Sequence, residues 1–419
     1  MRVTSLKLTN IRAIEAAEFR FKPGFNLIVG VNGVGKTSVL RALTVNLSAI
    51  VRGVNREART SSVETFAVDD IRFKAGALTA ECHVDIAGEA IAYLTHRPRT
   101  RFRVKRTSRG LPRAPVTDIP EIHGFLNGAP RLATDSDEGG RPFALFFGVG
   151  RASDRSTDPT KGSTHGGIRS AISGAFRSRS LRVSELEEWV RVQQRLRKEL
   201  PQARRVMAAL EKAIQRFLPG YKNLRVVERP QRDLVIDLNG KPLPVRQLSD
   251  GERGVLSIVV DLTRRLALGN PTMPDPASKA EAVVMIDEID LHLHPKWQRQ
   301  IVRNLTAAFP RCQFIATTHS PQVIGEVHHD RIQIIADGQV YSPSHSFGVD
   351  SSRILEEIMD ADPRSQEIGA LLSQISQDVG KQRYESAREL LVQLVEKLGE
   401  NDPEVTRIRT LLDFMQGEL

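Results

Sequence analysis

The feature that most constrains this chain is a glycine-rich loop that begins at Gly30 and ends at Thr37. Its residues, GVNGVGKT, fit the pattern G-x-x-x-x-G-K-[ST] without deviation. The segment Gly24–Ile28 precedes it as a predicted strand, and Thr37–Val51 follows with the apolar spacing of a helix. A strand, a glycine turn and a helix N-terminus in this order present backbone N–H groups to phosphate. The loop therefore predicts an α/β fold with a nucleotide-phosphate site.

The side chains of this loop divide by chemistry. Lys36 is expected to reach the β and γ phosphate oxygens as a point charge, and the Thr37 hydroxyl is expected to bind Mg²⁺. ATP and Mg²⁺ are therefore the predicted ligands. We expect the nucleotide to be held from this loop by Gly30, Asn32, Gly33, Val34, Gly35, Lys36, Thr37 and Ser38.

A second motif is an apolar strand that ends in two acids. Residues 282–286 are continuously apolar, as in a strand buried within a parallel sheet, and Asp287 and Glu288 follow directly. Ligands of α/β proteins bind at the carboxyl ends of such strands. We expect Asp287 to hold Mg²⁺ through water and Glu288 to polarise the attacking water.

A histidine follows another apolar strand, at residues 313–317. Taken alone, a histidine in this position is more often structural. His319, however, lies about thirty residues after the two acids. This order matches the switch histidine that senses the γ-phosphate, so His319 joins Lys36 and Glu288 as a predicted catalytic residue.

The segment Gln247–Arg253 decides the subclass. Its Leu-Ser-Asp-Gly sequence resembles the Leu-Ser-Gly-Gly signature of ABC and SMC-like ATPases, with Asp250 replacing the first glycine. The resemblance implies that Ser249, Gly251 and Glu252 contact the γ-phosphate bound to the opposite subunit, so that two shared sites form in a dimer. The alternative is a capped surface helix, since a serine followed three residues later by glutamate is a capping box.

Asn10-Ile11-Arg12 and the Asp-x-His-x-His-Pro segment at 290–295 resemble motifs of the RecF, SMC and OLD group. With the nucleotide motifs, the chain resembles the compact SMC-like ATPases of the Septu (PtuA-type) and related retron anti-phage systems. The resemblance implies an ABC/SMC-like head, a mixed β-sheet with flanking helices, that forms homodimers or higher oligomers through ATP-sandwiched heads. It also implies a separately encoded, PtuB-like HNH nuclease partner that the ATPase regulates.

The chain departs from the wider family in one place. No glutamine lies between Thr37 and Gln193, so the glutamine of the Q-loop has no counterpart. Its place in the site falls to Asp70 or Arg151.

Three other functions compete with a defence ATPase. A RecF-like DNA-repair ATPase is favoured by the +10 net charge and by the arginine-rich segment 97–113, which either contacts DNA or forms a solvated face. An OLD-type nuclease would need a Toprim domain, and the mostly helical residues after His319 argue against one. A transporter subunit is disfavoured by the Asn-Ile-Arg and His-x-His-Pro segments.

We expect four regions along the chain. They are an N-terminal ATPase lobe at 1–182, with a basic segment and a mobile loop at 152–182, a short helical insertion at 183–220 that Pro201 divides, a C-terminal ATPase lobe at 221–345, and a helical tail at 346–419. Two distant cysteines, no apolar run of membrane-spanning length and no signal peptide favour a cytoplasmic location without membrane contact.

Overall fold

The computed structural model describes residues 1–55, 63–99, 122–126, 141–152, 168–176, 183–228, 232–359, 361–362 and 364–416. These residues form two compact units, Met1–Val349 and Asp350–Leu419. The first unit is α/β and the second is helical. Within the described ranges, no helix is long and apolar enough to span a bilayer.

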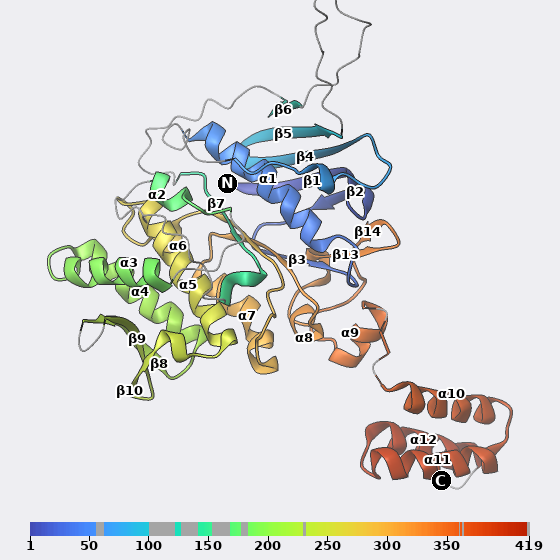
Figure 1. Cartoon of the computed structure of the whole chain (residues 1–419). Coiled ribbons are helices and arrows are strands. Elements are labelled where there is room, and N and C mark those ends of the chain that lie inside the picture. Colours follow the sequence, from blue (N-terminus) through green and yellow to red (C-terminus); the bar gives the residue numbers. More distant parts are fainter. Residues whose placement is uncertain are drawn as a thin grey trace, which may run out of the picture. The chain divides into compact units, whose positions relative to one another are not determined.

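A six-stranded, mostly parallel sheet forms the centre of the first unit (Figure 1). Five strands run parallel and the last, at one edge, runs antiparallel. The predicted strands before the phosphate loop, before the two acids and before His319 are all present and lie side by side, so their carboxyl ends meet at one edge. The order is β14 (Gln339–Tyr341), β13 (Ile332–Ala336), β3 (Phe25–Val29), β12 (Gln313–Thr317), β11 (Val283–Ile286) and β7 (Ala144–Phe147).

A five-stranded antiparallel sheet forms a second layer, and α1 (Lys36–Val54) packs against strands of both sheets (Figure 1). Because both faces of α1 are covered, most of its side chains are buried. Contacts on both faces therefore hold in place the helix that follows the phosphate loop. The second sheet runs in the order β2 (Ile14–Arg20), β1 (Arg2–Ile11), β4 (Ala77–Ile86), β5 (Glu89–Pro98) and β6 (Ile122–Phe125).

A helical region and a small sheet complete the first unit. Pro201 begins the second of two helices, as the sequence predicts. The helices are α2 (Ile168–Ile172), α3 (Val183–Leu196), α4 (Pro201–Phe217), α5 (Asp250–Gly269), α6 (Pro276–Lys279), α7 (Pro295–Ala308) and α8 (Pro321–Ile324). The small antiparallel sheet has β8 (Tyr221–Val227), β9 (Asp233–Leu238) and β10 (Lys241–Pro244).

The prediction of a continuous mobile loop at 152–182 was wrong in its middle, where α2 forms. The Arg265 side chain donates hydrogen bonds to the Ala171 and Ser173 carbonyls at 2.6 and 2.9 Å, and this fixes α2 against α5. Residues 153–167 and 177–182 lie outside the described ranges. Of the arginine-rich segment 97–113, only residues 97–99 are described.

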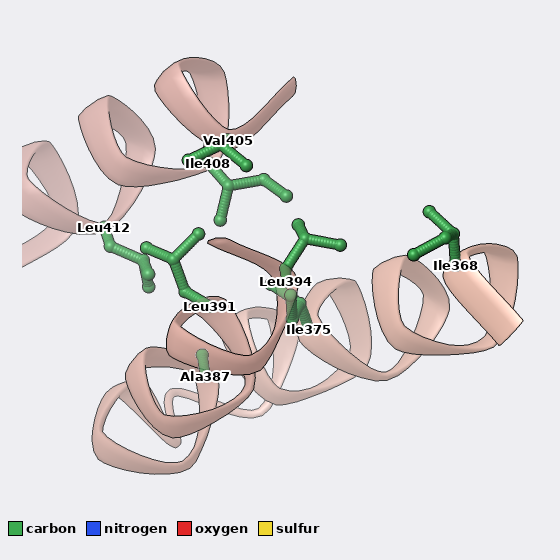
Figure 2. Packing of buried hydrophobic residues seen from close by; sticks show 8 residues of the cluster. All are labelled: Ile368, Ile375, Ala387, Leu391, Leu394, Val405, Ile408 and Leu412. Carbon is green, nitrogen blue, oxygen red and sulfur yellow. The ribbon is translucent and has the colours of Figure 1, made fainter. Parts of the chain in front are cut away.

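The C-terminal unit is helical, as predicted for the tail. Figure 2 shows its core, where buried residues of three helices meet. Asp402 caps the last helix, because its Oδ1 accepts a hydrogen bond from the Glu404 amide at 2.8 Å. The helices are α9 (Ser351–Glu357), α10 (Gln366–Gly380), α11 (Tyr384–Leu398) and α12 (Pro403–Gln416).

Candidate nucleotide-binding site

The phosphate loop connects β3 to α1, and two of its glycines are required by their surroundings. Gly30 has φ +155°, and a Cβ atom there would lie 2.6 Å from the Ile335 carbonyl oxygen. Gly35 has φ +111°, and its Cβ would lie 2.9 Å from Ile14. A side chain at either position would displace the loop from β13 or from the β1–β2 hairpin.

The ammonium group of Lys36 lies inside the loop. Its Nζ donates to the Gly30 and Val31 carbonyls at 2.7 and 2.9 Å. Burial lowers the pKa of Lys36, while the negative charges of Glu288 and Asp287 oppose that shift. Carboxylates therefore face the loop, and a phosphate would offer this ammonium a stronger acceptor than the two carbonyls.

Asp287 links the phosphate loop to the end of the neighbouring strand. Its carboxylate accepts a hydrogen bond from Thr37 Oγ1 at 3.1 Å and another from Thr317 Oγ1 at 2.6 Å. A hydroxyl and a carboxylate held together suit Mg²⁺, which binds one or two carboxylates and completes its shell with water and substrate phosphates. The two predicted metal ligands, Thr37 and Asp287, are thus in direct contact.

Thr317 is a site residue that the sequence reasoning missed. Its hydroxyl donates to Asp287 and accepts from the Glu288 amide at 2.8 Å, so it orients both acids. Glu288 itself has φ +46°, a left-handed conformation that costs a non-glycine residue about 1–2 kcal/mol. Strain of this kind gathers at functional sites, where surrounding contacts hold it in place.

Arg151 and Asp70, the two alternatives for the Q-loop position, have separate surroundings. Arg151 follows β7, which pairs with the strand of the two acids, and its guanidinium contacts the Asp287 and Glu288 carbonyls. Asp70 pairs instead with Arg12, whose Nη2 is 2.7 Å from Asp70 Oδ1. The Asp70 carboxylate therefore holds the turn at Arg12, and Arg151 occupies the strand end beside the acids.

His319 lies at the same edge of the sheet. Its backbone amide is 3.4 Å from Asp290 Oδ1, which also accepts a hydrogen bond from Thr318. Burial and the positive charge of Lys36 lower the pKa of His319, and this outweighs the opposing effect of the nearby acids. The imidazole is therefore held in its neutral form near pH 7.

The Ser249–Glu252 segment forms the capped helix that the sequence allowed as an alternative. The Ser249 amide donates to Glu252 Oε2 at 2.8 Å, and Ser249 Oγ accepts from the Glu252 amide at 3.3 Å. Tyr221 donates a further hydrogen bond to Glu252. Burial raises the pKa of Glu252, but the hydrogen bonds from Tyr221 and Ser249 hold it below its usual value. Ser249 and Glu252, which the sequence predicts to contact the phosphate, thus have hydrogen-bond partners within the chain.

Gly251 joins this helix to the segment after the acids. A Cβ atom at Gly251 would lie 2.3 Å from the His292 carbonyl oxygen, so the N-terminus of α5 packs closely on that segment. His294 caps α7 by accepting from the Lys296 amide at 3.2 Å. In the described part of the chain, no group of three or more His, Cys, Asp or Glu residues could hold a metal ion.

The structure thus brings Lys36, Thr37, Asp287, Glu288 and His319 together at the carboxyl edge of the central sheet. The remaining predicted loop residues flank Lys36 in sequence: Gly30, Asn32, Gly33, Val34 and Gly35 lead into α1, and Ser38 lies in its first turn. The signature residues Ser249, Gly251 and Glu252 lie at the start of α5. Gly251 packs on His292, in the segment that follows the two acids.

Comparison with known proteins finds matches to ATPase domains over parts of the chain. Residues 149–325 match the family model described as "AAA domain, putative AbiEii toxin, Type IV TA system", and residues 5–137 match a second AAA domain model. The chain is 37% identical to the Retron Ec83 probable ATPase of Escherichia coli over 210 residues, which cover 49% of this chain and 38% of that protein. It is 43% identical to the Septu protein PtuA of Bacillus mycoides over 77 residues, which cover 18% and 10%.

The alignments thus span well under half the length of these relatives. Among solved structures, an SMC head bound to the C-terminal winged-helix domain of ScpA matches with a TM-score of 0.50 at 13% identity. That match covers 82% of this chain and 97% of the SMC head. The chain thus has the fold of an SMC head and a complete phosphate loop, and over parts of its length it is similar to two AAA domain models, to a retron probable ATPase and to a Septu protein.

Proposed function

We propose that this site binds ATP with Mg²⁺ and hydrolyses the bond between the β and γ phosphates. The observation that carries the proposal is the hydrogen-bonded connection Thr37–Asp287–Thr317–Glu288, which ties the phosphate loop to both acids. Bound Mg²⁺ would neutralise phosphate charge during transfer. Lys36 binds the phosphates, Thr37 and Asp287 hold the metal, and Glu288 orients the attacking water.

The neutral imidazole of His319 supports its role as the γ-phosphate sensor. A neutral histidine can donate one hydrogen bond to the phosphate without competing with Lys36 for negative charge. Ser249, Gly251 and Glu252 are assigned to the phosphate of a second copy. Each dimer then has two shared sites, and ATP binding closes the heads while hydrolysis reopens them.

At the level of the cell, we propose that the ATPase acts in anti-phage defence by regulating a separately encoded HNH nuclease. The similarity to a retron ATPase and to a Septu protein supports this role. The chain's excess of basic residues supports an additional contact with DNA through the segment 97–113.

The enzymatic part is tested with purified protein. Lys36→Ala should lose ATP binding, and Glu288→Gln should retain binding but lose at least 100-fold in kcat, as removal of a water-orienting group does. Hydrolysis by Glu288→Gln at the wild-type rate would refute the assignment of Glu288.

The cellular part is tested in a host that carries the gene with its neighbours. Phage protection should require a neighbouring HNH gene and should vanish in Lys36→Ala. Protection that survives this substitution would contradict a defence role for the ATPase.

A further inference from the structure

Arg151 is buried, with 5% of its surface exposed, yet its guanidinium forms no ion pair with a carboxylate of the described residues. Its guanidinium binds backbone carbonyls instead. Nη1 donates to the Asp287 and Gly148 oxygens at 2.7 and 3.3 Å, and Nη2 donates to the Glu288 oxygen at 2.5 Å. Because its guanidinium donates to two successive carbonyls, Arg151 holds the backbone at one position.

That position is the strained residue Glu288. The peptide group before its Cα is held by Thr317, which accepts from the Glu288 amide, and by Arg151, which donates to the Asp287 carbonyl. The peptide group after its Cα is held by Arg151 through the Glu288 carbonyl, which also accepts from the Leu291 amide at 2.9 Å, and by the Ile289 amide, which donates to the Thr317 carbonyl at 2.9 Å. Because both flanking peptide groups are fixed, the positive φ of Glu288 and the direction of its Cα–Cβ bond are fixed with them.

The Glu288 carboxylate needs this support. No donor among the described residues hydrogen-bonds to it, so the contacts that direct it act on its backbone and set where its side chain starts. The oxygens of a carboxylate without protein donors are available to accept a hydrogen bond from water. Small displacements of such a group are costly, since reacting atoms must lie within about 3–3.5 Å.

We propose that Arg151 is a positioning residue for hydrolysis, which fixes Glu288 through the carbonyls of Asp287 and Glu288 and does not bind the nucleotide. This inference rests on the proposed role of Glu288. Arginine suits the task because its planar guanidinium spans two acceptors, whereas the single ammonium of lysine cannot hold both in a fixed geometry.

The test compares Arg151→Lys with Arg265→Lys. Both arginines are buried and donate to backbone carbonyls, three for Arg151 and two for Arg265. Arg265, however, also pairs with Asp261, holds α2 and lies about 22 Å along α5 from its first residue. Arg151→Lys should lower kcat about 10- to 100-fold with the KM for ATP unchanged within about twofold. Arg265→Lys should lower the melting temperature and leave kcat within about twofold of the wild-type value.

Binding of ATP is measured separately in the Glu288→Gln background, where turnover is removed. Adding Arg151→Lys should leave the Kd for ATP unchanged. A weaker Kd would make Arg151 a nucleotide ligand and overturn the proposal, and so would a kcat of Arg151→Lys equal to that of Arg265→Lys.

Failure of this inference is distinct from failure of the proposed function. If Glu288→Gln hydrolyses ATP normally, the assignment of Glu288 is wrong. If Glu288→Gln is inactive but Arg151→Lys is fully active, only the positioning role is wrong. Should Arg151→Lys not fold, Arg151→Gln repeats the comparison, since its amide can donate to one carbonyl but carries no charge.

Discussion

The pKa of the single residue His319 depends on the burial and the charges around the site. Burial disfavours its protonated form, and the ammonium of Lys36 adds a repulsion between like charges. The neighbouring acids act in the opposite direction without reversing the shift. The imidazole is therefore expected to stay neutral to a lower pH than a free histidine.

We expect NMR titration of the nucleotide-free protein to give His319 a pKa below its ordinary value of 6.5. Lys36→Ala should raise that pKa, because it removes the neighbouring positive charge. Lys22→Ala serves as the control, since Lys22 pairs with Asp330 away from the site, and should leave the pKa unchanged. A His319 pKa at or above 6.5 would contradict the conclusion that burial and the charge of Lys36 lower it.

Individual residues of the site differ in how well the sequence predicts them. Lys36, Asp287 and Glu288 were predictable because each lies in a local motif whose order encodes strand, turn and helix. Arg151 was found only as one of two alternatives. It acts on backbone carbonyls 136 residues away, and no local pattern distinguishes it from the many other arginines of the chain. Thr317 was missed because its role exists only once β11 and β12 are paired.

At the scale of elements, the N-terminus of α5 is held by its contact with the segment after the acids. Gly251 has two separate explanations. The resemblance assigns it to the phosphate of a second subunit, whereas the structure shows that any side chain there would collide with the His292 carbonyl. The packing requirement exists within a single chain and can be measured without nucleotide.

We expect Gly251→Ala to destabilise the nucleotide-free protein by about 1–3 kcal/mol, as overpacking against a rigid backbone does. The measurement is thermal or urea unfolding without ATP. Gly369→Ala is the matched control, because Gly369 lies within α10 with no atom near its added Cβ, and alanine favours a helix. Unchanged stability of Gly251→Ala would mean that the contact with His292 is absent in solution.

Elements marked by a local apolar pattern were predicted from the sequence, and α2 was not. The central strands before the phosphate loop, the two acids and His319 are short, mostly apolar runs. By contrast, α2 spans five residues within a Ser-, Gly- and Arg-rich segment, and its stability comes from distant partners such as Arg265. Tertiary contacts of this kind leave no local signal.

At the scale of the whole molecule, charge is divided unequally along the chain. Residues 350–419 hold eight Lys and Arg against fifteen Asp and Glu, a net charge of −7. The first 349 residues therefore carry +17 to give the total of +10. Any affinity for a polyanion such as DNA is expected from the ATPase unit and not from the helical C-terminal unit.

We propose that ATP joins two copies of this chain through the site described above. Light scattering of Glu288→Gln, with and without ATP and Mg²⁺, tests it most directly, because this variant should bind ATP without hydrolysing it. We expect ATP to raise the particle mass at least twofold, against 46.6 kDa for one chain. The double variant with Lys36→Ala, which cannot bind ATP, should show no increase. A mass of Glu288→Gln that does not change with ATP would contradict the shared site.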